Sequence, residues 1–213
     1  MSLTLHFHPL SSFCHKALIA LYENDTPFER RIVNLMDPAD AAAFKKLWPC
    51  GKFPVLQDGN RTIPESSVII EHLDLQYPGK TRFIPADPKL ALQVRLKDRF
   101  YDLHVHDHMQ KVVGDKLRPE GKKDPHGVEN ARQRLTVSLD MIDAEMAGKT
   151  WAMGDEFTMA DCAAGPPLFY IDRLFPLAGS HKNVARYLGR LLERSSYARV
   201  IEEAKPYFSM LPF

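Results

Sequence analysis

The chain has few cysteines and no long apolar run, and both shortages restrict what it can be. Its 213 residues contain three cysteines, Cys14, Cys50 and Cys162. They are odd in number, far apart and without metal-ligand spacing, which indicates free thiols in a reducing compartment. No apolar run approaches the roughly 20 residues of a membrane-spanning helix, and residues 1–4 lack the basic and apolar regions of a secretory signal. We therefore expect a cytoplasmic protein that does not span a membrane.

The chain also lacks an excess of charge of either sign. Its 28 lysines and arginines are balanced by 27 aspartates and glutamates. This balance argues against nucleic acid or an anionic membrane as a partner, although it does not exclude a local charged patch. The length allows two modest domains, each able to bury a core.

Residues 1–79 alternate between strand and helix patterns. Leu3, Leu5 and Phe7 alternate with polar residues, which predicts a strand with one buried face. From Phe13 onward, apolar residues recur at helical spacing, which predicts a helix. Asp58-Gly59 predicts a hairpin turn. The further predicted elements are strands at 28–33, 55–56 and 61–63 and helices at 39–47 and 66–77. This order is typical of an α/β domain of the thioredoxin-like type.

The rest of the chain is predicted to be helical. Prolines punctuate residues 80–88, which indicates a linker, and residues 89–213 form an all-α domain in this interpretation. Thr158 and Asp161 stand three residues apart and predict a capping box at a helix start. The predicted helices cover 90–117, 128–146, 183–193 and 197–204.

The most specific motif runs from Gly51 to Gly59, and Ile63-Pro-Glu-Ser-Ser67 follows it. Pro54 heads the apolar pair Val55-Leu56, and proline is confined to strand starts, edges and bulges. The backbone of Phe53 beside it is left available to pair with a peptide-like ligand. Ser66 is predicted to cap the next helix, and a helix N-terminus is a ready site for a carboxylate. Backbone pairing together with a carboxylate site suits a small peptide.

These motifs, in this order, resemble the glutathione-binding half of the soluble glutathione S-transferases, and Trp151-x-x-Gly-Asp followed by the capping box resembles their helical domain. The resemblance covers essentially the whole chain. It implies a cis Phe53–Pro54 bond, a homodimer, glutathione as co-substrate and no metal or organic cofactor. By resemblance, Lys52, Phe53, Pro54, Glu65 and Ser66 bind glutathione: Glu65 and Ser66 hold the γ-glutamyl end, the Phe53 backbone beside Pro54 pairs with the cysteinyl unit, and Lys52 approaches the glycine carboxylate.

The chemistry is expected where the first strand meets the first helix. A thiol pKa of about 8.5 leaves little thiolate at neutral pH, and a hydroxyl donor near a helix N-terminus lowers that pKa. Ser11 and Ser12 are the available hydroxyls. Ser11 matches the position of the thiol donor in serine-type transferases and is our first choice. Ser12 and Cys14 are the runners-up, although Ser12 is more naturally expected to cap the helix. Cys14 is expected to be buried, and a cysteine-type mechanism requires it to be exposed.

Three histidines in the long helix suggest a metal cluster. His104 and His108 share a helix face, but nothing at suitable spacing supplies a third ligand, so no metal is predicted. By resemblance, the middle of this helix faces the active cleft. The predicted electrophile pocket comprises Leu10, Phe13, His104, His108 and Met109.

The resulting hypothesis is a detoxifying glutathione transferase that directs the glutathione thiolate at a hydrophobic electrophile. Three alternatives stay open: a glutathione-dependent isomerase, a thiol-disulfide oxidoreductase acting through Cys14, and a non-catalytic glutathione-binding module. The isomerase is less favoured because its class carries Ser-Ser-Cys before an arginine-bearing helix start, whereas Phe13 takes the place of that cysteine here.

Overall fold

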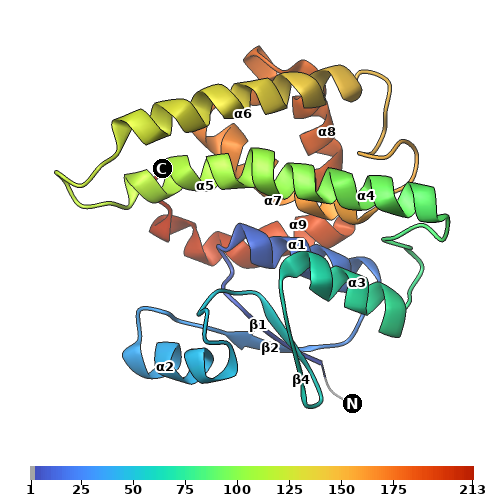
Figure 1. Ribbon diagram of the computed structural model, residues 1–213, viewed down its shortest axis with the longest axis vertical. Helices are drawn as coiled ribbons and strands as arrows, with labels where there is room; N and C mark the ends of the chain where they lie inside the picture. The colour runs from blue at the N-terminus through green and yellow to red at the C-terminus, as the bar shows by residue number, and fades with distance from the viewer. Residues whose placement is uncertain (1–2) are drawn as a thin grey trace. The chain divides into compact units, whose positions relative to one another are not determined.

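A computed structural model describes residues 3–213 and groups them into two compact units (Figure 1). The first unit comprises the chain up to Ile84 together with Ser195–Ser209, and the second comprises Pro85–Arg194 with Met210–Phe213. The segment 195–209, which the sequence assigned to the helical domain, thus groups with the first unit. The predicted domain limits at 79 and 89 stay a prediction.

The first unit is built on a four-stranded mixed sheet. Its strands are β1 (Leu3–Phe7), β2 (Glu29–Ile32), β3 (Val55–Asp58) and β4 (Arg61–Pro64), in the spatial order β2-β1-β3-β4. Strand β1 runs parallel to β2 and antiparallel to β3, and β3 and β4 form an antiparallel hairpin. Leu3, Leu5 and Phe7 are buried and the residues between them are partly exposed, so the predicted alternation is confirmed.

Helices cover the two faces of this sheet. On one side lie α1 (Ser12–Glu23), α3 (Ser66–Gln76) and α9 (Ser195–Ala204), and on the other α2 (Pro38–Leu47) (Figure 1). Helix α1 packs against both α3 and α9. Two hydrogen bonds, each of 2.7 Å, join α1 to α9: the Ser196 hydroxyl donates to Glu23, and the Tyr22 hydroxyl donates to Glu203. These bonds help explain why α9 groups with the first unit.

The second unit is helical, as predicted. The expected helix at 90–117 is confirmed as a continuous helical stretch, with the correction that its middle is π-helical. The elements are α4 (Pro88–Phe100), the π-helical turn Tyr101–His106, α5 (Asp107–Lys116), α6 (Pro125–Glu145), α7 (Met159–Leu174) and α8 (Lys182–Glu193). Helix α7 packs against α4, the π-helical turn and α8. It is buried from Met159 to Ile171, so it forms the core of this unit.

The predicted capping box at the start of α7 is present and deeply buried. The Asp161 carboxylate accepts hydrogen bonds from the Thr158 amide at 2.8 Å, the Ala152 amide at 2.7 Å and the Tyr187 hydroxyl at 2.6 Å. Burial raises the pKa of Asp161, and these hydrogen bonds oppose the rise. The box therefore joins α7 to α8 and to the preceding loop, besides capping its own helix.

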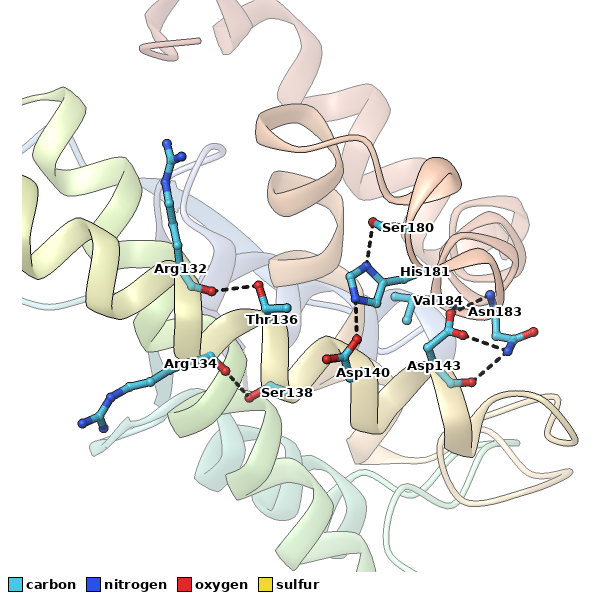
Figure 2. A network of polar contacts seen from close by, with 10 residues as sticks. All are labelled: Arg132, Arg134, Thr136, Ser138, Asp140, Asp143, Ser180, His181, Asn183 and Val184. Atoms are coloured by element: carbon cyan, nitrogen blue, oxygen red, sulfur yellow. Dashed lines mark hydrogen bonds and ion pairs between the residues drawn. The ribbon is translucent and has the colours of Figure 1, made fainter.

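Helix α8 is capped by a residue of another helix (Figure 2). Its N-cap residue, His181, makes no side-chain capping bond. Instead, the Asp143 carboxylate of α6 accepts from the amides of Asn183 at 2.8 Å and Val184 at 3.1 Å. His181 is hydrogen-bonded to Asp140 at 3.2 Å. The Asp143 carboxylate satisfies amides that a helix start leaves without intrahelical partners, so this polar network is structural.

The element order confirms the predicted fold class, an α/β part followed by an all-α part. Within residues 3–213, no helix combines the length and apolar character needed to cross a bilayer.

Candidate functional site

Ser11 starts the first helix at the end of the turn that follows β1. Its backbone is extended, with φ −76° and ψ 117°, and its Oγ accepts a hydrogen bond from the Cys14 amide at 3.3 Å. Ser11 is therefore the N-cap of α1, and the prediction that Ser12 caps this helix is wrong. The reason is geometric: the capping side chain belongs to the last extended residue, from which it reaches the amide three residues on. Ser12 is the first helical residue and is 2% exposed.

Cys14 lies behind Ser11 and is fully buried, as expected. Burial raises the pKa of its thiol to about 12, although a hydrogen bond with Ser11 opposes the rise. A thiol with this pKa supplies almost no thiolate at neutral pH. Ser11, in contrast, is only half-buried at the helix N-terminus.

The proline motif stands beside this turn in the same unit. The Phe53–Pro54 peptide bond is cis, as the resemblance implied. Pro54 is buried, Phe53 is half-buried and Lys52 is exposed. The Phe53 ring stacks on His8, with ring centroids 6.0 Å apart. Because His8 accepts the Ser11 amide through its carbonyl oxygen at 3.0 Å, the proline motif and the Ser11 turn are neighbours.

The start of α3 differs from the prediction. Glu65, not Ser66, is the N-cap residue, and it makes no side-chain capping bond. Its φ of 69° lies in the left-handed region, which costs a non-glycine residue about 1–3 kcal/mol and is concentrated at functional sites. Glu65 is exposed, while Ser66 is 5% exposed and lies in the first turn. Both residues thus stay at a helix N-terminus, where a carboxylate is favoured.

Lys16 is a residue of this region that the sequence analysis did not single out. Its side chain is 0% exposed, and its Nζ donates to the Ser67 hydroxyl at 2.8 Å. This hydrogen bond ties α1 to the first turn of α3, next to Ser66. The available signal was a lysine directly before the apolar run Ala17–Leu21 of α1.

The second unit contains three members of the predicted electrophile pocket: His104, His108 and Met109. His104 is exposed, His108 is half-buried, and Met109 lies in the core at 2% exposure. Burial, followed by the charge of Arg134, lowers the pKa of His108. Among residues 3–213, no three histidine, cysteine or carboxylate side chains gather as metal ligands. Leu10 and Phe13, the other members of the predicted pocket, are half-buried in the first unit.

Comparisons with known proteins agree with this arrangement. Residues 5–81 match the family model described as the N-terminal domain of glutathione S-transferase, and residues 125–190 match the model of its C-terminal domain. The stringent starvation protein A homolog of Coxiella burnetii is 28% identical over 95% of this chain and 93% of that protein. Glutathione S-transferase Z2 of Arabidopsis thaliana is 28% identical over 96% of this chain and 92% of that protein.

The fold has a close counterpart among solved structures. A glutathione S-transferase from Methylobacillus flagellatus, crystallised with GSH bound, has a TM-score of 0.85 at 26% identity, over 93% of this chain and 98% of that chain. The fold and the site elements together define a protein with a glutathione S-transferase architecture. With both domain models matched, the chain belongs to the glutathione S-transferase family.

Proposed function

We propose that the chain is a glutathione transferase in which the Ser11 hydroxyl stabilises the glutathione thiolate for attack on a hydrophobic electrophile. The observation that carries the proposal is the contrast at the start of α1. Ser11 is half-buried at the helix N-terminus, whereas the Cys14 thiol is fully buried with its pKa raised to about 12.

The remaining candidate residues of the first unit would bind the peptide. Ser66 and the first amides of α3 would hold the γ-glutamyl carboxylate, and Glu65, held at φ 69°, would face the γ-glutamyl amino group. The backbone of Phe53, preceding Pro54, would pair with the cysteinyl unit, and the exposed Lys52 would approach the glycine carboxylate. Each charged end of the tripeptide thus has a group of opposite charge or a helix terminus to meet it.

The reaction needs no nucleophile from the protein. The glutathione thiol loses its proton to water, and the Ser11 O–H donates to the resulting sulfur anion. A hydroxyl has one donor and two acceptor positions, so Ser11 can donate to the sulfur while it accepts the Cys14 amide at 3.3 Å. The thiolate then forms a carbon–sulfur bond with the electrophile, and the leaving group departs with the electron pair of the broken bond.

Within the first unit, the electrophile would meet Leu10 and Phe13, whereas His104 and His108 of the second unit stay candidates from the sequence. Leu10 and Phe13 are half-buried, and His104 is exposed. Met109 belongs to the core of its own unit, so we assign it a supporting position behind the histidines. Detoxification by conjugation is the role that we propose for this reaction.

A disulfide oxidoreductase acting through Cys14 is less well supported, because its attacking group must be an accessible thiolate. The second candidate is a non-catalytic glutathione-binding protein. The observation that favours it is the similarity to a stringent starvation protein A homolog, whose name states no transferase activity.

A homodimer completes the proposal. Helix α4 exposes Leu92 and Leu96, which are 68% and 69% exposed and lie one helical turn apart. Helix α3 exposes Leu75 at 71%. A second copy of the chain would cover these apolar side chains.

Two measurements on the wild-type protein test the proposal. Calorimetry with glutathione should show binding, and conjugation of a chloronitrobenzene should proceed faster than the uncatalysed reaction. Binding without conjugation of a panel of electrophiles would support the non-catalytic candidate. Absence of glutathione binding would contradict both candidates.

A further inference from the structure

His8 is a polar residue of the first unit whose geometry gives it a role beyond those assigned above. It follows β1 directly, and its carbonyl oxygen accepts the Ser11 amide at 3.0 Å. Its backbone therefore helps to set the turn that presents the Ser11 hydroxyl.

The hydrogen bonding of the His8 ring defines which of its nitrogen atoms carries the proton. The Leu10 amide donates to Nδ1 at 3.2 Å. A nitrogen that accepts a hydrogen bond is unprotonated, so the proton of the neutral ring is on Nε2. Burial lowers the pKa of His8, which keeps the ring neutral at pH 7. No group among residues 3–213 is hydrogen-bonded to Nε2, so this N–H is available to a ligand.

Aromatic contacts fix the orientation of the ring. The His8 and Phe53 rings stack at an angle of 20°, with centroids 6.0 Å apart. The Tyr207 ring, from the 3-10 helix Lys205–Met210, meets His8 edge-on at 5.8 Å. The stacked contact and the edge contact limit rotation of the ring, so its donor is preorganised in the way that favours charge stabilisation.

We propose that the Nε2–H of His8 is a second hydrogen-bond donor to the cysteinyl sulfur of bound glutathione, beside the Ser11 hydroxyl. The proposal rests on the proposed function. The sulfur is the expected target because the two neighbours of His8, Ser11 and Phe53, are the residues assigned to the cysteinyl unit. The charged ends of the peptide are assigned to other groups. His8 keeps its proton throughout, and the thiol proton still leaves to water.

The test removes the donor and keeps the aromatic ring. His8→Phe retains a ring against Phe53 and Tyr207 but has no N–H, whereas His8→Gln keeps a donor. His6→Phe is the matched control, because His6 lies two residues earlier, on β1, stacks on Phe44 at 6.2 Å and is hydrogen-bonded to Gln57 at 2.6 Å. The readout is the ultraviolet absorbance of the bound thiolate as a function of pH, together with the conjugation rate.

We expect His8→Phe to raise the thiol pKa of bound glutathione by about 1 unit and to lower the conjugation rate below that pKa about tenfold. His8→Gln should recover at least half of the shift, and His6→Phe should leave the titration unchanged. Affinity for the sulfur-free analogue γ-glutamyl-2-aminobutyryl-glycine should be the same in the wild type and in His8→Phe, because the analogue offers no sulfur to the donor.

An unchanged thiolate titration in His8→Phe would overturn the proposal, and so would an equal loss of affinity for glutathione and for the sulfur-free analogue. Should His8→Phe lose its fold by circular dichroism, His8→Met serves as the second variant without a donor. If the wild type binds no glutathione, the proposed function itself fails. If the wild type binds and conjugates while His8→Phe titrates normally, the function stands and only the role of His8 is refuted.

Discussion

Replacing Ser11 by alanine should affect the fold and the chemistry by separable amounts. The Ser11 Oγ accepts the Cys14 amide at 3.3 Å, and loss of such a cap costs about 1 kcal/mol of stability. Loss of the donor to the sulfur should remove about 1.4–4 kcal/mol of thiolate stabilisation, which corresponds to about a 10- to 1,000-fold lower conjugation rate. Glutathione affinity should change little, because the candidate contacts to the peptide ends are intact.

Three further variants separate the two effects. Ser11→Asp keeps a capping acceptor, since aspartate is as good an N-cap as serine, but it offers no donor and places a negative charge near the sulfur. It should melt close to the wild type and conjugate at least as slowly as Ser11→Ala. Ser12→Ala removes a buried hydroxyl and should cost stability without changing the rate, and Cys14→Ala should be nearly neutral in rate.

The assay is the conjugation rate against pH for the four variants, with the absorbance of bound thiolate measured in parallel. The reasoning is refuted if Ser11→Ala keeps the full rate and the wild-type thiolate titration while Cys14→Ala abolishes both. That outcome would make Cys14 the catalytic residue despite its burial.

Three other predictions concern binding, pH and assembly. In calorimetry, Ser66→Ala should weaken glutathione binding by about 1–3 kcal/mol. The melting temperature should change little, because Glu65 and not Ser66 is the N-cap of α3. An unchanged affinity would contradict the assignment of Ser66 to the γ-glutamyl carboxylate. Burial lowers the pKa of His15 from 6.5 to about 4, so the folded state resists protonation. Its contribution of up to about 3 kcal/mol to the free energy of unfolding is present above pH 6.5 and is lost as the pH falls toward 4. Urea unfolding at a series of pH values should show this loss of stability below pH 6.5, and His15→Gln should reduce it. An equal loss in His15→Gln would refute the attribution to His15. By light scattering, the wild type should have twice the chain mass of 24.3 kDa. Leu96→Glu should lower the measured mass to that of a single chain, whereas Gln93→Glu, a control at another exposed position of α4, should leave it unchanged. A monomeric wild type would contradict the proposed dimer.

Much of the fold could be predicted because its signals are local. Alternating apolar residues at Leu3, Leu5 and Phe7 predict a half-buried strand whatever lies around them. The proline before Val55 and the Asp58-Gly59 turn are equally local, and they mark a hairpin that the structure contains. The capping box at Thr158 and Asp161 is a four-residue signal, and it is present.

The N-caps of α1 and α3 are features that local sequence signals did not predict correctly. The sequence offers two adjacent serines at 11 and 12, and it cannot say which one remains extended. The structure makes Ser11 the cap because its amide is already bonded to His8, which leaves Ser12 to enter the helix. At α3 a glutamate in the left-handed region takes the N-cap position, which a local preference for serine does not anticipate.

Long-range neighbours are the part that only the tertiary structure decided. His8 and Phe53 are 45 positions apart in the chain, and the pairing of β1 with β3 brings them into contact. Lys16 and Ser67 meet because α1 packs on α3. Periodicity and capping propensity depend on residues within a few positions, so they identify elements. Which side chains gather at a site depends on sheet register and helix packing, and these are set by the whole chain.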